Sequence, residues 1–155
     1  MNLKALIDKK NIILNLNIES KKRLNEFLAN RLANSYPDVD EDLVLKNIYK
    51  RERIGNTYIG KNIYIPHCRV KNLNTTKIIV VTMKNNYYDD SIKNSIKMAV
   101  GVFFPDNISD IHMELLKQLA SFLKKDQTQQ HFKEVQNAND LYNLIVETKK
   151  EDEPV

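Results

Sequence analysis

The sequence contains one cysteine, three glycines and no tryptophan. One thiol allows no internal disulfide, which is compatible with a reducing compartment. The longest apolar runs, 78–83 and 98–105, are far too short to cross a bilayer, and residues 1–16 lack the apolar segment and the cleavage site of a signal peptide. These absences argue against a disulfide-stabilised or membrane-spanning protein, and we expect a cytoplasmic one.

The 155 residues are 42% apolar and 28% charged, which is ordinary for one globular domain with a sizeable core. We expect that domain to span residues 1–148, followed by a disordered charged tail at 149–155. An isoelectric point near 9 raises the question of nucleic acid. Outside one central stretch, however, acidic residues interleave the basic ones, and no helix carries a basic stripe with aromatic partners. We therefore expect no nucleic-acid partner.

Strand-like and helix-like patterns are mixed along the chain. β-branched or alternating apolar residues predict strands, whereas apolar residues spaced by three and four predict helices. Ser20 is expected to cap the first helix, Asp38 or Asp40 the second, Ser109 or Asp110 the third, and Asn137 or Asn139 the last. Such a mixture predicts a three-layer α/β or α+β domain. The expected strands are 11–17, 63–65, 77–83 and 96–104. The expected helices are 21–33, a second that ends near 51, a third that ends near 125, a fourth at 127–135 and a last one that begins near 138. Residues 85–94 are expected to be mainly loop.

Two of the three glycines, Gly55 and Gly60, lie shortly before Pro66 and His67. Glycine is retained where the backbone needs a positive φ or a close approach. The stretch 50–71 also holds six basic residues and one acid. Because Pro66 disfavours a continued strand, we expect His67 to stand where strand 63–65 ends. Backbone N–H groups, a guanidinium and an imidazole in one place favour an oxyanion such as a phosphoryl group.

Other chemistries have weaker support. The three histidines and Cys68 show no zinc-ligand spacing, the serines and Cys68 lie in no hydrolase signature, and the glycine-containing loop lacks the Gly-Lys-Ser/Thr of a P-loop. Taken singly, His67 could be an exposed turn residue and His112 a helix-end residue without chemistry. We assign His131 to the surface. His112 matters only if it meets His67.

The run from Arg51 to His67, REXXGNTYIGKNIYIPH in outline, resembles the phosphorylation-site signature of the mannitol/fructose-type IIA domains of the bacterial phosphoenolpyruvate phosphotransferase system. The segment His-Met-Glu-Leu-Leu at 112–116 is similar to a second motif of that family, and Ser-Lys-Lys at 20–22 to its first long helix. The free-standing size is most like the nitrogen-regulatory branch. The resemblance covers nearly the whole chain.

This resemblance implies a mixed β-sheet of about five strands flanked by helices on both faces. It also implies that His67 is phosphorylated, that Arg51 and His112 assist, and that no metal or other cofactor is needed. The expected donor is an HPr-like phosphocarrier protein (NPr), and the expected receivers are regulated target proteins or a IIB domain. Sugar-specific transfer to IIB and a regulatory docking module without transfer remain alternatives. The expected phosphoryl-binding residues are Gly55, Asn56, Thr57 and Gly60.

Several positions depart from the family pattern. Asn56 replaces Ser or Thr, Asn62 a glycine, Tyr64 a small alanine and Cys68 a glycine. Lys97 stands where the family has an acid before the second buried strand, which puts any role of that acid in doubt. We expect these changes to alter partner fit or the speed of transfer. They leave the nucleophile in place.

Overall fold

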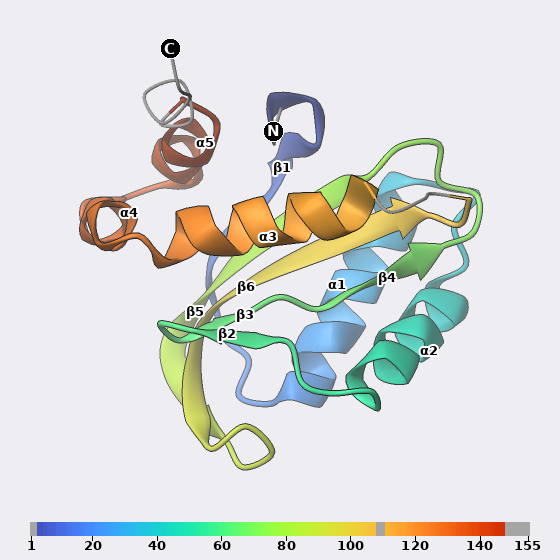
Figure 1. Cartoon of the computed structure of the whole chain (residues 1–155), viewed down its shortest axis with the longest axis horizontal. Helices are drawn as coiled ribbons and strands as arrows, with labels where there is room; N and C mark the ends of the chain where they lie inside the picture. Colours follow the sequence, from blue (N-terminus) through green and yellow to red (C-terminus); the bar gives the residue numbers. More distant parts are fainter. Residues whose placement is uncertain (1–2, 108–110, 148–155) are drawn as a thin grey trace.

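The computed structural model describes residues 3–107 and 111–147, without the side chains of Ile111 and His112. The elements are η1 (Leu3–Ala5), β1 (Ile7–Leu16), α1 (Lys21–Ser35), α2 (Glu41–Glu52), β2 (Tyr58–Gly60), β3 (Ile63–Tyr64), β4 (His67–Val70), β5 (Lys77–Asp89), β6 (Asn94–Pro105), α3 (Ile111–Lys124), α4 (Asp126–Phe132) and α5 (Ala138–Glu147). Within these described residues, after η1, one strand is followed by two helices, then by five strands in succession, and last by three helices (Figure 1).

The strands form one mixed sheet in the order β1-β5-β6-β3-β2, and β4 also pairs with β6. β5 and β6 are antiparallel neighbours at its centre, whereas β1 runs parallel to β5, and both β3 and β4 run parallel to β6. The sheet has six strands, where about five were expected, because β3 and β4 follow one another along the same side of β6. A mixed α/β architecture is thus confirmed.

Both faces of the sheet are covered, as the sequence predicted (Figure 1). Apolar residues of α1 and α2 pack on one face, and those of η1, α3 and α5 on the other. Strand β5 shows why: Ile79 and Val81 point into the first layer, and Ile78 and Val80 into the second. Full burial of one such side chain contributes about 1.5–3 kcal/mol, so this double-sided strand anchors the core.

Local capping chemistry accounts for the helix starts. The Ser20 hydroxyl accepts from the Arg23 N–H at 3.1 Å, and the Asp40 carboxylate from the Leu43 N–H at 3.2 Å. Asn137 accepts from the Asp140 N–H at 2.8 Å in front of α5. Each side chain satisfies an N–H that has no partner within its own helix. Asp40 and Asn137 are therefore the caps among the two alternatives expected for each helix.

The expected loop at 85–94 was wrong. β5 continues to Asp89, and β6 begins at Asn94, so the two strands make a long hairpin with a short turn. Tyr87 pairs with Ile96 and is only 6% exposed. Pairing with β6 gives this polar stretch the strand conformation that its own composition does not indicate.

The cap expected at Ser109 or Asp110 and the tail expected at 149–155 lie outside the described residues. α3 ends at Lys124, close to the expected end, and α4 is shorter than the expected helix 127–135. Among the described helices, none combines the length and the apolar content needed to span a bilayer.

Candidate functional site

His67 and Arg51 meet where the end of α2 lies beside the start of β4. The strand prediction needs correction here, because His67 begins β4 instead of ending the strand before it. Pro66 has no N–H and interrupts the ladder, but its carbonyl accepts from the Val102 N–H at 3.0 Å, and pairing with β6 resumes at His67. The imidazole is therefore held on a strand of the central sheet.

The two ring nitrogens of His67 have different partners. Nδ1 lies 2.9 Å from the Ile65 carbonyl oxygen, and Arg51 Nε donates to Nε2 at 3.2 Å. A carbonyl only accepts, so Nδ1 carries the proton, and Nε2 presents its lone pair to the guanidinium. Both contacts are satisfied by one neutral tautomer of the ring.

Arg51 also holds the loop that follows α2. Its Nη1 donates to the Gly55 carbonyl at 3.0 Å, and the Gly55 N–H donates to the Glu52 carbonyl at 3.2 Å. As a cation in the last turn of α2, Arg51 also suits the negative end of the helix dipole. Gly55 has no positive φ, and a Cβ there would meet no protein atom within 4 Å, so neither backbone conformation nor packing requires this glycine.

The expected phosphoryl-binding residues fall into two groups. Asn56 is exposed, and its side-chain oxygen accepts from the Tyr58 N–H at 3.2 Å. Thr57 is only 7% exposed, and its hydroxyl donates to Glu52 at 2.9 Å. Together with Gly55 they form the loop beside Arg51. Gly60 instead belongs to the β2–β3 hairpin, whose register places it toward the end of β3 away from His67.

The β2–β3 hairpin explains how Asn62 replaces the family's glycine. Lys61 and Asn62 have φ values of 55° and 63°, and Gly60 has φ 96°. A two-residue turn with both φ values positive matches the twist of a hairpin, and asparagine tolerates this region better than most residues. The Asn62 side chain also donates to the Ser95 carbonyl at 3.0 Å. Asn62 thereby ties the hairpin to β6.

His112 lies in the first turn of α3, as the sequence predicted. Its side chain lies outside the described residues, so its meeting with His67 stays a prediction. His131 lies in α4 and takes no part in the Arg51–His67 contact.

Two further departures, Tyr64 and Cys68, lie in the interior behind the site. Tyr64 is fully buried, and its hydroxyl donates to Asn25 at 3.2 Å. Cys68 is 7% exposed and faces the α1–α2 side of the sheet, whereas His67 is half-buried. Successive residues of a strand point to opposite faces, which separates the thiol from the imidazole.

Cys68 is expected to be unreactive in the folded protein. Burial raises the pKa of its thiol from 9.0 to about 12, so at pH 8 the thiolate fraction is roughly 1,000-fold lower than in the unfolded chain. The raised pKa means that this group's contribution to stability is complete below pH 9 and is lost as pH rises toward 12. Alkylation by iodoacetamide at pH 8, followed by mass spectrometry, should label the protein only after denaturation. Fast labelling of the native protein would contradict this.

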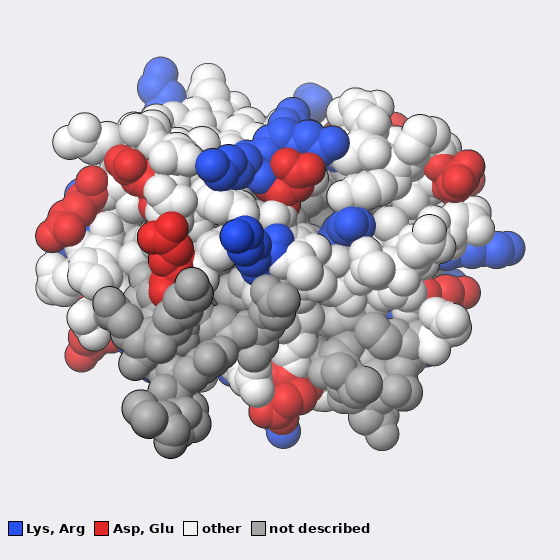
Figure 2. Space-filling view, turned by 90° about the horizontal axis from the view of Figure 1, so that it is seen from above, with Lys and Arg blue, Asp and Glu red and all other residues white. Residues whose placement is uncertain are grey.

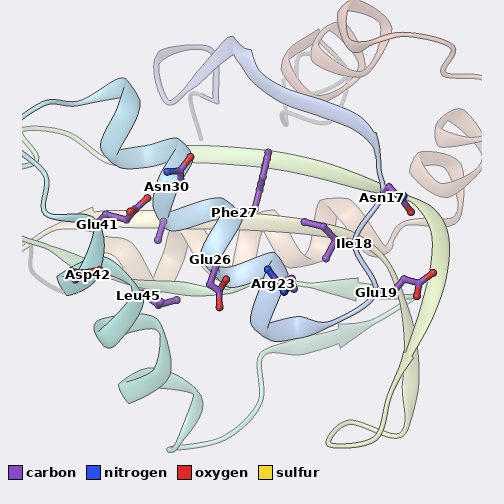
Figure 3. Close-up of a pocket in the computed structure, with 11 residues that line it drawn as sticks. Asn17, Ile18, Glu19, Arg23, Glu26, Phe27, Asn30, Glu41, Asp42 and Leu45 are labelled. Atoms are coloured by element: carbon purple, nitrogen blue, oxygen red, sulfur yellow. The ribbon is translucent and has the colours of Figure 1, made fainter.

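Other surface features differ chemically from the Arg51–His67 site. A groove of about 960 Å³ lies between α1, the start of α2 and the β1–α1 connection (Figure 3). Its lining includes Glu19, Glu26, Glu41 and Asp42 but no histidine or cysteine, so it suits neither nucleophilic chemistry nor an anion. Within the described ranges, no cluster of three metal-ligating side chains occurs. On the face in Figure 2, several basic side chains gather near the centre, with an acidic side chain among them.

Comparison with known proteins assigns the chain to a family. The profile of the "Phosphoenolpyruvate-dependent sugar phosphotransferase system, EIIA 2" family matches residues 5–148. The chain belongs to this EIIA family. Domains of the family are phosphocarrier domains of the phosphotransferase system. The expectation drawn from the run Arg51–His67 is thereby confirmed at the level of the family.

Proteins similar to this chain include nitrogen regulatory proteins and enzyme IIAMTL. The nitrogen regulatory protein of Pseudomonas aeruginosa is 28% identical over 129 residues, which cover 83% of this chain and 84% of that protein. The crystal structure of nitrogen regulatory protein IIA-Ntr from Neisseria meningitidis superposes with a TM-score of 0.83 at 20% identity, covering 92% of this chain and 97% of that one. Escherichia coli enzyme IIAMTL, solved in complex with phosphorylated enzyme IIBMTL, shares the fold at a TM-score of 0.69 and 17% identity, with 90% and 97% covered.

Two residues of the site, Lys21 and Glu52, were not among the candidates from the sequence. Glu52 accepts the Thr57 hydroxyl, and Lys21 pairs with Glu52 at 2.9 Å. Both residues lie within the stretches that carried the family resemblance. No local feature marked them, because an acid at one helix end and a base at another usually face solvent.

Proposed function

We propose that this chain is a cytoplasmic phosphohistidine carrier of the nitrogen-regulatory type, which accepts a phosphoryl group on His67 from an HPr-like carrier protein. The supporting observation is the contact of 3.2 Å between Arg51 Nε and His67 Nε2 beside the Gly55 loop. A nucleophilic nitrogen, a fixed guanidinium and a short polar loop are what transfer of a phosphoryl group requires. Family membership supplies the phosphotransferase context.

The tautomer assigns the attacking atom to Nε2. The Nε2 lone pair attacks the phosphorus of the donor's phosphohistidine, and the new N–P bond forms as the bond to the donor nitrogen breaks. The electron pair of the broken bond stays on the donor imidazole. The proton on Nδ1 of His67 remains hydrogen-bonded to the Ile65 carbonyl, which offsets the positive charge that the ring gains. No proton needs to leave His67 in this step.

Arg51 has two roles in this reaction. In the resting protein its Nε–H occupies the direction of the Nε2 lone pair, so it moves aside when the phosphorus approaches. The same guanidinium then donates to the phosphoryl oxygens, where negative charge accumulates in the transition state. Gly55, Asn56 and Thr57 form the loop beside it, and we propose that exposed backbone groups of this loop complete the oxyanion site; Gly60 acts indirectly, through the hairpin.

The surface around the loop suits a docking carrier. Ile54, directly before Gly55, is 83% exposed. Arg53 and Arg69, which belong to the basic stretch 50–71, are exposed as well. An exposed apolar side chain among cations fits a partner with an apolar patch and acidic surroundings.

Transfer onward to a IIB domain is the second candidate function. The shared fold of enzyme IIAMTL, solved with its IIB partner, favours this alternative. Incubation with phosphoenolpyruvate that carries a labelled phosphoryl group and with the general phosphotransfer enzymes, followed by addition of a IIB domain, separates the functions. Label that stays on this chain supports regulation, and label that moves to IIB supports sugar transfer. Absence of label on the wild-type chain would leave only docking without transfer.

We further propose that His112, at the start of α3, donates to the phosphoryl group. His112→Ala is expected to slow transfer on the order of 100-fold, because one preorganised donor is lost while His67 remains. Rapid-mix transfer measurements and thermal melts on the same samples check this. The helix should survive, since Leu119 and Leu123 still pack in the core. An unchanged rate would reduce His112 to a helix-end residue, and a collapsed melt would make it structural.

A further inference from the structure

An ion pair lies behind the active-site loop. Lys21 is the first residue of α1 and Glu52 the last of α2, and Lys21 Nζ lies 2.9 Å from Glu52 Oε2. Their side chains are only 18% and 11% exposed. The exposed pair of Lys22 with Glu26, next along α1, is 4.0 Å long. A pair this buried adds little net stability after desolvation, so its geometry calls for another explanation.

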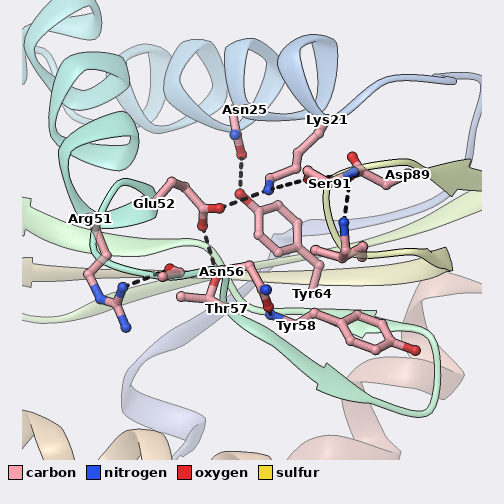
Figure 4. A network of polar contacts seen from close by, with 12 residues as sticks. Lys21, Asn25, Arg51, Glu52, Asn56, Thr57, Tyr58, Tyr64, Asp89 and Ser91 are labelled. Atoms are coloured by element: carbon pink, nitrogen blue, oxygen red, sulfur yellow. Dashed lines mark hydrogen bonds and ion pairs between the residues drawn. The ribbon is translucent and has the colours of Figure 1, made fainter.

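From Glu52, hydrogen bonds lead to His67 in three steps. Glu52 Oε1 accepts from the Thr57 hydroxyl at 2.9 Å (Figure 4). The Thr57 carbonyl accepts from the Ile65 N–H at 3.0 Å, and the Ile65 carbonyl accepts from His67 Nδ1 at 2.9 Å. Ile65 lies in the gap between β3 and β4, where it has no strand partner to orient its peptide groups. Thr57 therefore sets the position of the carbonyl that faces the imidazole.

Tyr64 and Asn25 pack against the same pair. Lys21 Nζ lies 5.2 Å from the centre of the Tyr64 ring, and the Tyr64 hydroxyl donates to Asn25 (Figure 4). Burial and, after it, the negative charge of Glu52 raise the pKa of Tyr64. Lys21, Thr57 and Tyr64 thus surround the Glu52 carboxylate. Together they hold it in the orientation in which Oε1 faces Thr57.

We propose that Glu52 is a positioning residue for His67: through Thr57 and the Ile65 carbonyl it holds the imidazole in the tautomer whose lone pair is on Nε2, with Lys21 as its counter-ion. This inference rests on the proposed phosphotransfer for its effect on rate. Its structural part, the control of the tautomer, stands apart from that reaction. A second hydrogen-bonding shell commonly fixes the tautomer of a reactive histidine in this way.

The test uses Glu52→Ala and Thr57→Val in the full chain. Thr57→Val removes one hydroxyl at nearly constant volume and leaves the ion pair intact. Each variant is expected to slow phosphoryl transfer about 10-fold or more, as loss of an outer-shell partner typically does. In both variants, nitrogen-15 NMR of the His67 ring should show a mixture of the Nδ1–H and Nε2–H tautomers, whereas the wild type should show the Nδ1–H tautomer. Glu52→Gln keeps an acceptor oxygen for Thr57. It should therefore reduce the transfer rate less than Glu52→Ala does, and it should shift the tautomer of His67 less.

Glu26→Gln is the matched control, because it changes an exposed carboxylate of a neighbouring pair and should alter neither measurement. Wild-type rates together with an unchanged tautomer in Thr57→Val would overturn the inference. If Glu52→Ala fails to fold, Thr57→Val still decides the question. If even the wild-type chain accepts no phosphoryl group, the proposed function fails, while the NMR spectra of wild type and Thr57→Val still show whether this path positions the ring.

Discussion

Replacing His67 with alanine is expected to abolish phosphorylation of this chain by a phosphorylated HPr-like carrier. The variant lacks the Nε2 atom that accepts from Arg51 Nε and that would form the N–P bond. Mass spectrometry of the intact protein after incubation with the donor system measures the outcome directly. A phosphate retained by the variant would place the acceptor elsewhere and remove the central proposal.

The fold should tolerate this change. The imidazole is half-buried, and the backbone of β4 keeps its pairing with β6. We expect a loss of about 1 kcal/mol or less in the free energy of unfolding, whereas a core truncation costs several. His131→Ala is the matched control, since it removes another histidine and should leave phosphorylation unchanged. A large fall in the melting temperature of His67→Ala would instead indicate a structural histidine.

Arg51→Ala is expected to reduce the rate of phosphoryl transfer roughly 1,000-fold, with His67 still slowly phosphorylated. The variant loses the donor to the phosphoryl oxygens, and it also releases the Gly55 carbonyl that Arg51 Nη1 binds. Arg51→Lys should recover part of the rate, because it restores the charge but not the planar fork of donors. Quench-flow measurement of labelled protein against time gives both rates.

Arg53→Ala provides the control for charge alone. Arg53 is an exposed cation two positions away, and its loss should change the encounter rate and its salt dependence without a comparable loss in the transfer step. Equal defects in Arg51→Ala and Arg53→Ala would show that general electrostatics, and not the contact with His67, governs the reaction.

Local chemistry explains why some features were predictable from the sequence. Ser20 and Asp40 cap helices through contacts with residues three positions away. The apolar composition of the run 77–83 is enough to predict that this strand is buried. His67 and Arg51 became candidate site residues because a long family motif surrounds them. The helix caps and the buried strand depend on contacts or composition within one short segment. The candidate site residues were predicted from the family motif instead.

Other features depend on partners distant in the chain. Residues 85–89 are polar and became part of β5 only by pairing with β6. His67 begins β4 because the Val102 N–H donates to the Pro66 carbonyl and pairing with β6 resumes at His67. A short segment does not encode its hydrogen-bonding partner in a sheet, so its composition alone predicted a loop in the first case and a strand end in the second.

By itself the sequence determined which residues make up the candidate site: a histidine, an arginine and a glycine-containing loop on an α/β domain. Only the tertiary structure decided the geometry. It set the Nδ1–H tautomer through the Ile65 carbonyl and the approach of Arg51 to Nε2. It also brought Lys21 to Glu52, whose positions are far apart in the chain. The physical reason is that hydrogen bonds and ion pairs act over about 3 Å, and packing of α1 and α2 on the sheet decides which groups come within that distance.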